Sequence, residues 1–428
     1  MKTKKNLVKL MFMSILTAGM MTLTACSSED DVFTEAQNAS QVMNNPVARS
    51  ERTVLIYMAG RNNLSLFATS DLDEIKRGSK LIGSNQTLLV FMRRNYDGGQ
   101  PWLARVENGE LTGKVTIADM GIKKDELYAS DPEVMEKVLH YAYSHYPSVK
   151  NDYGLVLWGH GSGWLIQDSV SVKSTRGYGV DVGNYIYNPD GKWINVPTMN
   201  KVISRMPHLK FIFADCCNFM CLETLYEMRN VADYIIGSPA EVPATGAPYE
   251  EVVSALFEPT TFYRSIIDRY HEHEGGHLPL SVVKTSEMEH VAQATRDVLK
   301  SISKRQGDTW PDMKGMIHYN YLKNTQEFHQ PYNIFYDAGN FLLGYATSEE
   351  YQQWKQTLDA AVIEKRYADS WATIKPWDAF YTDFTMTKEK YHGVSLFVPQ
   401  DPTVEYGECY ASLNKHIQQL QWFYVVNQ

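Results

Sequence analysis

Dense positive charge is missing from most of this sequence. The 428 residues carry a formal net charge of -9, and no block of Lys and Arg follows the lysines of the first ten residues. Affinity for nucleic acid depends on clustered cations that neutralise phosphates, so nucleic acid is not an expected partner. Hydrophobic residues make up 44% of the chain, which is enough for a sizeable globular core.

Cysteine is also scarce, and its placement argues against a disulfide framework. Five cysteines are present, and Cys216, Cys217 and Cys221 lie within six residues of one another. So tight a group cannot join distant parts of a long chain. A reactive thiol is the better interpretation.

Long apolar runs are absent except near the N-terminus. A basic start precedes a mostly apolar stretch from Leu10 through Leu23, which is typical of a secretory signal rather than of a membrane-spanning helix. The sequence Leu-Thr-Ala-Cys that ends at Cys26 resembles a bacterial lipobox. This resemblance implies cleavage before Cys26, acylation of its sulfur and a lipid-anchored protein of the cell envelope. The alternative is an uncleaved membrane helix in which Cys26 is incidental.

The residues that follow the lipobox indicate surface export and a tether. The acidic stretch at residues 27–31 resembles the export signal of Bacteroides lipoproteins, which implies display at the outer membrane. Residues 26–50 as a whole are rich in Ala, Asn, Gln and Ser without a sustained period, and they are interpreted as a flexible tether. Residues 1–25 form the signal peptide in this interpretation.

Apolar strands alternate with helices beyond the tether. Short runs rich in β-branched and aromatic residues predict buried strands at Thr53–Ala59, Thr87–Met92, Tyr153–Trp158 and Leu209–Ala214. Such strands, separated by helices, favour a mostly parallel α/β sheet covered on both faces. Ligand sites in these sheets lie at the carboxyl ends of the strands.

Two of the predicted strands end in residues that can do chemistry. His160 stands between two glycines that permit an unusual turn, and Cys217 follows 57 positions later. A thiol reacts as the thiolate, and a histidine can take its proton and later protonate a leaving amine. The alternatives are a turn histidine held by backbone groups and a small buried cysteine. The pair, in this order, is similar in spacing to the caspases.

Several segments resemble the clostripain-like cysteine peptidases of the caspase-like clan. The match includes residues 157–161 (Leu-Trp-Gly-His-Gly) around the histidine and residues 215–217 (Asp-Cys-Cys) as an Asp-x-Cys motif. It also includes the first strand with Asn-Asn-Leu at residues 53–64, the loop at residues 238–249 and, more weakly, residues 393–399. The resemblance implies a caspase-like sandwich, with a mostly parallel central sheet flanked by helices.

The resemblance also implies roles for single residues. Cys217 rather than Cys216 is the expected nucleophile, because Asp215 stands two positions before it, as the family's acidic residue does. Asp215 would form part of the pocket for the residue before the scissile bond, which favours Arg and, less well, Lys; the alternative is that it caps the next helix. Backbone amides near Gly161 and Cys217 would stabilise the oxyanion. No organic cofactor is expected, and calcium, required by some relatives, has no named ligands here.

Further expectations concern the rest of the chain. Residues 51–250 are predicted to form the catalytic core, and residues 251–428 a mixed α/β subdomain that completes the peptidase. A helix directly after Cys217 is expected to favour its thiolate through the helix dipole. Residues 167–195 are polar and are interpreted as one irregular surface excursion. Lys173 and Arg176 within it are candidate sites of self-cleavage, because relatives cut themselves in this region.

The sequence therefore predicts a lipid-anchored, monomeric cysteine endopeptidase that acts on proteins or peptides through a thioester on Cys217. The competing hypothesis is a catalytically silent surface lipoprotein that uses the same cleft to bind peptide or glycan. Covalent labelling of Cys217 by a peptidyl electrophile would separate the two.

Overall fold

The computed structural model describes residues 50–95, 100–124, 127–166, 177–183, 191–307, 309–319, 333–371, 384–404 and 407–428. Cys26, Lys173 and Arg176 lie outside these ranges, and so does most of the expected tether. Within the described part of the chain, no helix has both the length and the apolar character needed to cross a membrane.

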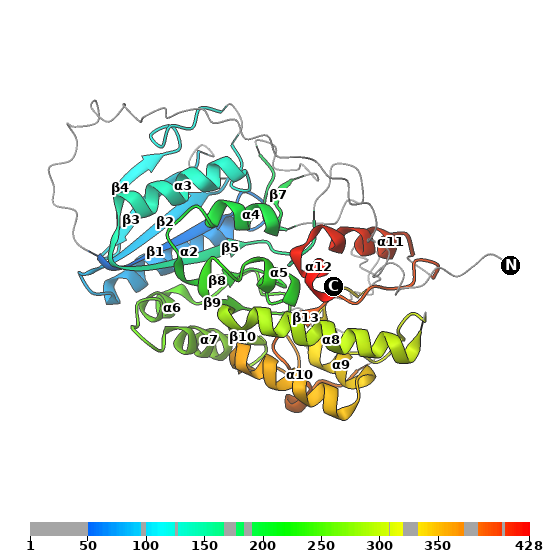
Figure 1. The fold of residues 1–428 in the computed structure, drawn as a ribbon. Coiled ribbons are helices and arrows are strands. Elements are labelled where there is room, and N and C mark those ends of the chain that lie inside the picture. Colours follow the sequence, from blue (N-terminus) through cyan, green and yellow to red (C-terminus); the bar gives the residue numbers. More distant parts are fainter. Residues whose placement is uncertain are drawn as a thin grey trace, which may run out of the picture.

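A nine-stranded sheet runs through the centre of the molecule (Figure 1). Its order is β12-β10-β9-β8-β5-β1-β2-β3-β4. The central five strands, from β9 to β2, are parallel, whereas two strands at each edge run antiparallel to their neighbours. The strands are β1 (Ser50–Ala59), β2 (Gln86–Arg93), β3 (Trp102–Glu107), β4 (Glu110–Thr116), β5 (Ser148–Gly159), β8 (Leu209–Asp215), β9 (Ala232–Gly237), β10 (Leu280–Lys284) and β12 (Val362–Arg366).

Helices cover both faces of this sheet. Successive side chains of a strand point to opposite faces, and in β1 Leu55 and Tyr57 pack into one apolar cluster while Val54 and Ile56 pack into the other. The second cluster includes side chains of α2 (Ser65–Gly78), α6 (Tyr249–Ala255) and α7 (Phe262–His273). The first includes side chains of α3 (Pro132–His145), α4 (Val196–Ile203), α5 (Leu222–Glu227), α8 (Met288–Gln306), α9 (Ala338–Tyr345), α10 (Ser348–Ala361), α11 (Gly407–His416) and α12 (Gln421–Val426).

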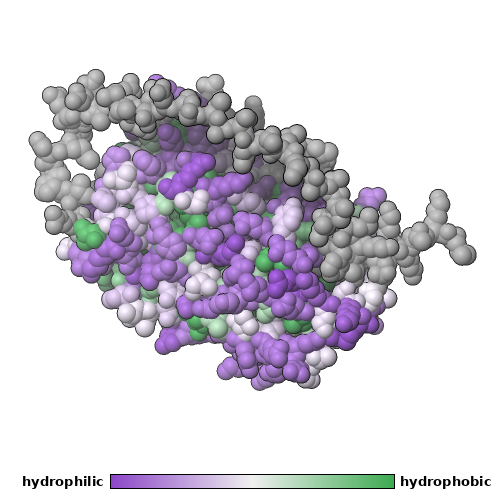
Figure 2. All heavy atoms as spheres, in the orientation of Figure 1, coloured by the Kyte–Doolittle hydropathy of each residue, from purple (hydrophilic) through white to green (hydrophobic). Residues whose placement is uncertain are grey.

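The predicted architecture is confirmed by this arrangement. The four predicted strands fall within β1, β2, β5 and β8, and the sheet has helices on both sides. Because the helices bury the apolar faces, the surface seen in Figure 2 is largely hydrophilic, with small separate hydrophobic patches.

The segment between the two reactive residues is more regular than predicted. It contains β6 (Tyr178–Asp181) and β7 (Lys192–Ile194), which pair antiparallel. The buried Tyr178 hydroxyl lies 3.0 Å from the carbonyl oxygens of both Tyr57 and Trp158. The prediction of one irregular surface excursion over residues 167–195 is therefore wrong for these two strands, because long-range hydrogen bonds hold them against the sheet.

Residues after 250 extend the same sheet. Strands β10 and β12 form one of its edges, while the short pair β11 (Tyr336–Asp337) and β13 (Ser395–Leu396) lies outside it. The amide of Ser395 donates to the carbonyl of Met220 at 2.9 Å, which ties β13 to the loop that follows β8. The division into a core at 51–250 and a subdomain at 251–428 stays a prediction, and the second part contributes strands to the sheet of the first.

Candidate active site

The two candidate catalytic segments begin at the same edge of the sheet. Strands β5 and β8 are parallel neighbours, and Trp158 is in register with Asp215. The loops that carry His160 and Cys217 therefore leave the sheet side by side. They line one pocket together, which we call the acidic pocket. It is lined by Leu64, Trp158, Gly159, His160, Asp215, Cys217, Val242, Pro243, Ala244 and Gly246.

A sharp turn presents His160 to this pocket. Gly159 has φ of 140°, a conformation that residues with a side chain rarely adopt, and it lies against the carbonyl of Ala59. The carbonyl of His160 accepts a hydrogen bond from the amide of Gly179 in β6 at 2.8 Å. The turn is thus fixed from both sides, and β6 supports the histidine.

The imidazole of His160 has a partner that the sequence did not identify. Its Nε2 lies 2.7 Å from Oδ1 of Asn63, in the loop after β1. An amide oxygen only accepts, so Nε2 carries the proton and Nδ1 is the basic nitrogen of the neutral ring. Asn62 shapes this loop, because its side-chain amide donates to the carbonyls of Ala59 and Val180. The Asn-Asn-Leu motif was the only sequence signal for Asn63.

The two adjacent cysteines differ in their exposure. Cys216 is fully buried, whereas Cys217 is half-buried and lines the acidic pocket. A Cβ atom placed on Gly161 would lie 2.7 Å from the carbonyl oxygen of Cys217, so only glycine permits this close approach of the two loops. The role of the Gly161 amide in an oxyanion hole stays a prediction.

The thiol of Cys217 is protonated at neutral pH in this arrangement. Burial, followed by the negative charge of Glu241, raises its pKa to about 12, although the amide of Val242, 3.4 Å from Sγ, acts in the opposite direction. A thiol in such surroundings needs a base to react. His160 lines the same pocket, and its role as that base stays a prediction.

The expected helix does not begin directly after Cys217. Asn218 has φ of 56°, and α5 starts at Leu222 with Cys221 at its N-cap. The prediction that the helix dipole lowers the pKa of Cys217 is therefore wrong, because an intervening turn separates the thiol from the helix. That turn is bonded to the next loop, with the amide of Asn218 donating to the carbonyl of Ala240 at 2.9 Å.

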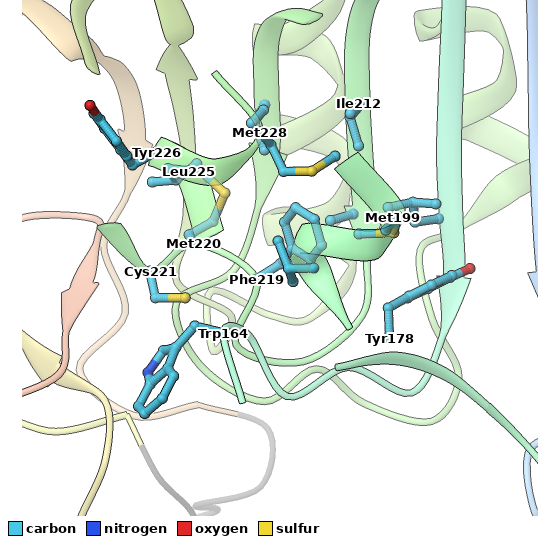
Figure 3. Close-up of a cluster of buried hydrophobic side chains, with 14 of the residues drawn as sticks. Trp164, Tyr178, Met199, Ile212, Phe219, Met220, Cys221, Leu225, Tyr226 and Met228 are labelled. Carbon is cyan, nitrogen blue, oxygen red and sulfur yellow. The ribbon is translucent and has the colours of Figure 1, made fainter. Parts of the chain in front are cut away.

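Cys221 belongs to the core of the molecule. It is fully buried, and Figure 3 shows it beside Trp164 in an apolar cluster with Phe219 and Met220. Its sulfur lies 3.0 Å from the hydroxyl of Thr224. These contacts give Cys221 a packing role.

Asp215 forms a buried wall of the acidic pocket. It is 3% exposed, and its carboxylate accepts hydrogen bonds from the hydroxyls of Tyr249 and Tyr270, each at 2.8 Å, and from the amide of Ala247 at 3.0 Å. Burial raises its pKa, although these three donors oppose the shift. Asp215 does not cap the following helix, because Cys221 occupies the N-cap position of α5.

A second buried carboxylate lies beside Asp215. Asp71, on α2, accepts a hydrogen bond from the indole nitrogen of Trp158 at 2.7 Å. A Cβ atom on Gly246 would lie 3.0 Å from Oδ2 of Asp71 and 3.0 Å from Oδ2 of Asp215. The sequence analysis missed Asp71. The available signal was a carboxylate on the apolar face of α2, where Ala68 and Ile75 are also buried.

No group of three or more His, Cys, Asp or Glu side chains in the described ranges is arranged to hold a metal ion.

The comparison with protein families agrees with this geometry. A model of the clostripain family matches residues 56–428, which include both strand ends of the acidic pocket. The chain belongs to the clostripain family. Its predicted caspase-like α/β fold, with a mostly parallel sheet flanked by helices, is confirmed by the family's solved structures.

Three solved structures of C11 cysteine proteases are similar to this clostripain-family chain. A secreted C11 cysteine protease from Bacteroides thetaiotaomicron, in complex with an irreversible peptide inhibitor, has 29% sequence identity and a TM-score of 0.67 over 88% of this chain and 99% of that one. An inactive zymogen C11 protease from Parabacteroides distasonis has 26% identity and a TM-score of 0.69 over 89% and 99%. Another secreted protease from B. thetaiotaomicron, at 17% identity and a TM-score of 0.63 over 88% and 99%, shows the fold alone. No curated protein matches the chain.

Proposed function

We propose that this clostripain-family protein is a cysteine endopeptidase that cleaves after Arg and, less well, after Lys. One observation carries the specificity. The buried carboxylate of Asp215 lines a pocket that also holds a thiol and an imidazole, and a second buried carboxylate, Asp71, lies directly behind it. The hydrogen-bond donors to both carboxylates among the described residues are all neutral. A desolvated carboxylate needs a cation, and the substrate can supply one.

The reaction follows from the groups that line the acidic pocket. The substrate's cationic side chain binds beside Asp215, which brings the carbonyl of the same residue to Cys217. His160 accepts the thiol proton on Nδ1 while the sulfur attacks the carbonyl carbon, because a thiol with a pKa of about 12 is not ionised beforehand. Backbone amides near Gly161 and Cys217 donate hydrogen bonds to the oxyanion and stabilise it.

Bond cleavage and deacylation complete the cycle. The imidazolium of His160 gives its proton to the leaving amine, and the acyl group remains on Cys217 as a thioester. Water, deprotonated by His160, then attacks the thioester and releases the carboxylic acid and the thiol. Asn63 keeps the imidazole in one tautomer and orientation throughout, since its Oδ1 accepts from Nε2.

Labelling and hydrolysis test this function against a silent binding lipoprotein. The wild-type protein should hydrolyse an arginyl peptide and react with a peptidyl-arginine electrophile at Cys217, and Cys217→Ala should do neither. Cys216→Ala is the matched control, and it should keep most activity because Cys216 faces the core. Tight peptide binding without hydrolysis or labelling in the wild-type protein would favour the silent binder.

We also propose self-processing near Lys173 or Arg176, because a basic residue in a polar segment suits the proposed specificity. Mass spectrometry of the purified protein should find a cut after one of them, and Cys217→Ala should stay intact. A fully active preparation with an uncut chain would show that processing is not required.

The proposed location is the cell envelope, with a lipid on Cys26 as the anchor of a monomer. Cys26→Ser should move the protein from the membrane fraction to the soluble fraction. Continued sedimentation of the variant with membranes would contradict the lipobox interpretation.

A further inference from the structure

Asp71 lies just behind the acidic pocket rather than on its lining. It is 2% exposed, and it contacts Trp158 and lies next to Gly246, two residues that form the pocket's wall. The two carboxylate oxygens that flank Gly246 are each 3.0 Å from the position of a Cβ atom there. They are therefore no more than twice that distance apart.

In the described part of the chain, every hydrogen-bond donor to this pair is neutral, and His160 and Cys217 are the other titratable groups that line the acidic pocket. Glu74 is on the same helix as Asp71 and adds negative charge, while Tyr249 of α6 and Tyr270 of α7 donate to Asp215. Trp158 of β5 donates to Asp71. Two carboxylates so close and so buried cannot both be ionised without a large cost in free energy, because each disfavours the charged form of the other.

We propose that Asp71 is a second specificity-determining carboxylate: Asp71 and Asp215 share one proton while the acidic pocket is empty, and a substrate guanidinium or ammonium releases that proton to solvent. The inference rests on the proposed specificity for basic residues. The cation of the substrate replaces the proton as the positive charge between the two carboxylates, so binding and deprotonation are linked.

The pKa values agree with this arrangement. Burial and the charge of Asp215 raise the pKa of Asp71 to about 8, even though Trp158 donates a hydrogen bond to it. The proton is therefore present at neutral pH in the empty pocket. Proton and substrate cation compete, so affinity for a basic ligand should rise with pH below about 8 and then level off.

The test counts protons released on binding to the Cys217→Ala protein, which binds without turnover. The ligand is a short acetylated peptide amide that ends in arginine, and calorimetry is done near neutral pH in two buffers of different ionisation enthalpy. About one proton should leave per peptide bound, and the dissociation constant should fall by up to about tenfold per pH unit below the pKa of the pair. With Asp71→Asn added, release should vanish and the pH dependence should flatten.

Two controls separate this inference from its alternatives. Asp73→Asn removes an exposed carboxylate from the same helix and should behave like the parent protein. The same peptide ending in citrulline, which has nearly the shape of arginine without its charge, should release no proton. Equal proton release by the parent and Asp71→Asn would overturn the role of Asp71 while leaving the specificity intact. Equal affinity for the arginine and citrulline peptides would overturn the proposed specificity itself.

A second variant covers the case in which Asp71→Asn does not fold. Histidine is the side chain type that ordinarily changes charge near neutral pH, and His160 lines the acidic pocket, so His160→Ala is added to the Cys217→Ala protein. Release of about one proton should persist in this double variant. Its loss would assign the proton to His160 and overturn the proposal.

Discussion

Two buried aspartates of this protein differ in the charge of their partners, because one is paired with a cation and the other accepts hydrogen bonds only from neutral groups. Asp181, at the end of β6, is fully buried and pairs with Arg93, which is 2% exposed; Nε and Oδ2 lie 3.2 Å apart. Asp215 is buried to a similar degree, but its three hydrogen-bond donors are neutral. A buried charge is tolerated when it is paired. The protein supplies its own cation to Asp181, and this ion pair stabilises the fold. None of the donors to Asp215 is a cation, so its charge is left for a cationic substrate.

The largest expected effect comes from removing the charge of Asp215. Asp215→Asn should lower kcat/KM on an arginyl peptide by about a thousandfold, because the substrate cation would be desolvated without a counter-charge. Its melting temperature should change little, since the asparagine oxygen can still accept from Ala247 and Tyr249 while its amide nitrogen donates to the hydroxyl of Tyr270. An unchanged preference for Arg in a folded variant would place the specificity elsewhere.

Removing the charge of Asp181 should act on stability first. Asp181→Asn leaves Arg93 buried without its counter-ion, which should cost about 3 kcal/mol of unfolding free energy in a denaturant titration. The matched control is Asp152→Asn, since Asp152 pairs with the buried Arg52 at 2.8 Å but is itself 23% exposed. A loss at Asp181 no greater than that at Asp152 would remove the distinction between the two aspartates.

The partner of His160 offers a smaller test. His160, like Asp215, depends on a neutral side chain, here the amide oxygen of Asn63. Asn63→Ala should lower kcat by about tenfold, a part of what general acid–base catalysis supplies, while KM stays nearly constant. Asn63→Asp keeps an acceptor oxygen at the same place and should restore most of the rate. Equal losses in the two variants would mean that Asn63 acts only through the shape of its loop.

The smallest effect concerns a third buried carboxylate, Glu223 of α5. Its Oε1 accepts from the amide of Phe397 at 2.6 Å, and burial raises its pKa to about 7. An acid whose pKa is raised by folding binds its proton more tightly in the folded state. Its contribution to stability is therefore complete below the unfolded pKa and is lost as the pH rises through about 7.

Glu223→Gln should remove that dependence. From mildly acidic to mildly alkaline pH, the wild-type protein should lose about 1–2 kcal/mol more unfolding free energy than the variant does. Parallel stability curves for the two proteins would show that Glu223 does not titrate in this range.

The central strands could be predicted from the sequence, while the edges could not. Strands β1, β2, β5 and β8 each contain a continuous apolar run, because helices cover both faces of the sheet there. Strand β4 has no buried residue, and β12 is half-buried along its length, so neither has a strong apolar pattern. Strands β6 and β7 depend on contacts such as the hydrogen bond from Tyr178 to Tyr57, 121 positions away.

The residues of the candidate site also fall into those that the sequence could predict and those that it could not. His160, Cys217 and Asp215 stand in local motifs at strand ends, and a local motif can be read from one segment of sequence. Asp71 and Asn63 act through partners 87 and 97 positions away, so only the folded chain shows what they contact. The absence of a helix directly after Cys217 also depends on distant bonds, since the turn there is held by the loop at Ala240.

The most direct test of the account is the rate at which the wild-type protein cleaves three matched peptides that differ only in the residue before the scissile bond. That residue is arginine, lysine or citrulline. The buried carboxylates predict that kcat/KM is highest for arginine, lower for lysine and at least about a hundredfold lower for citrulline than for arginine. Cleavage after citrulline at the same kcat/KM as after arginine would contradict the claim that the acidic pocket selects its substrate by charge.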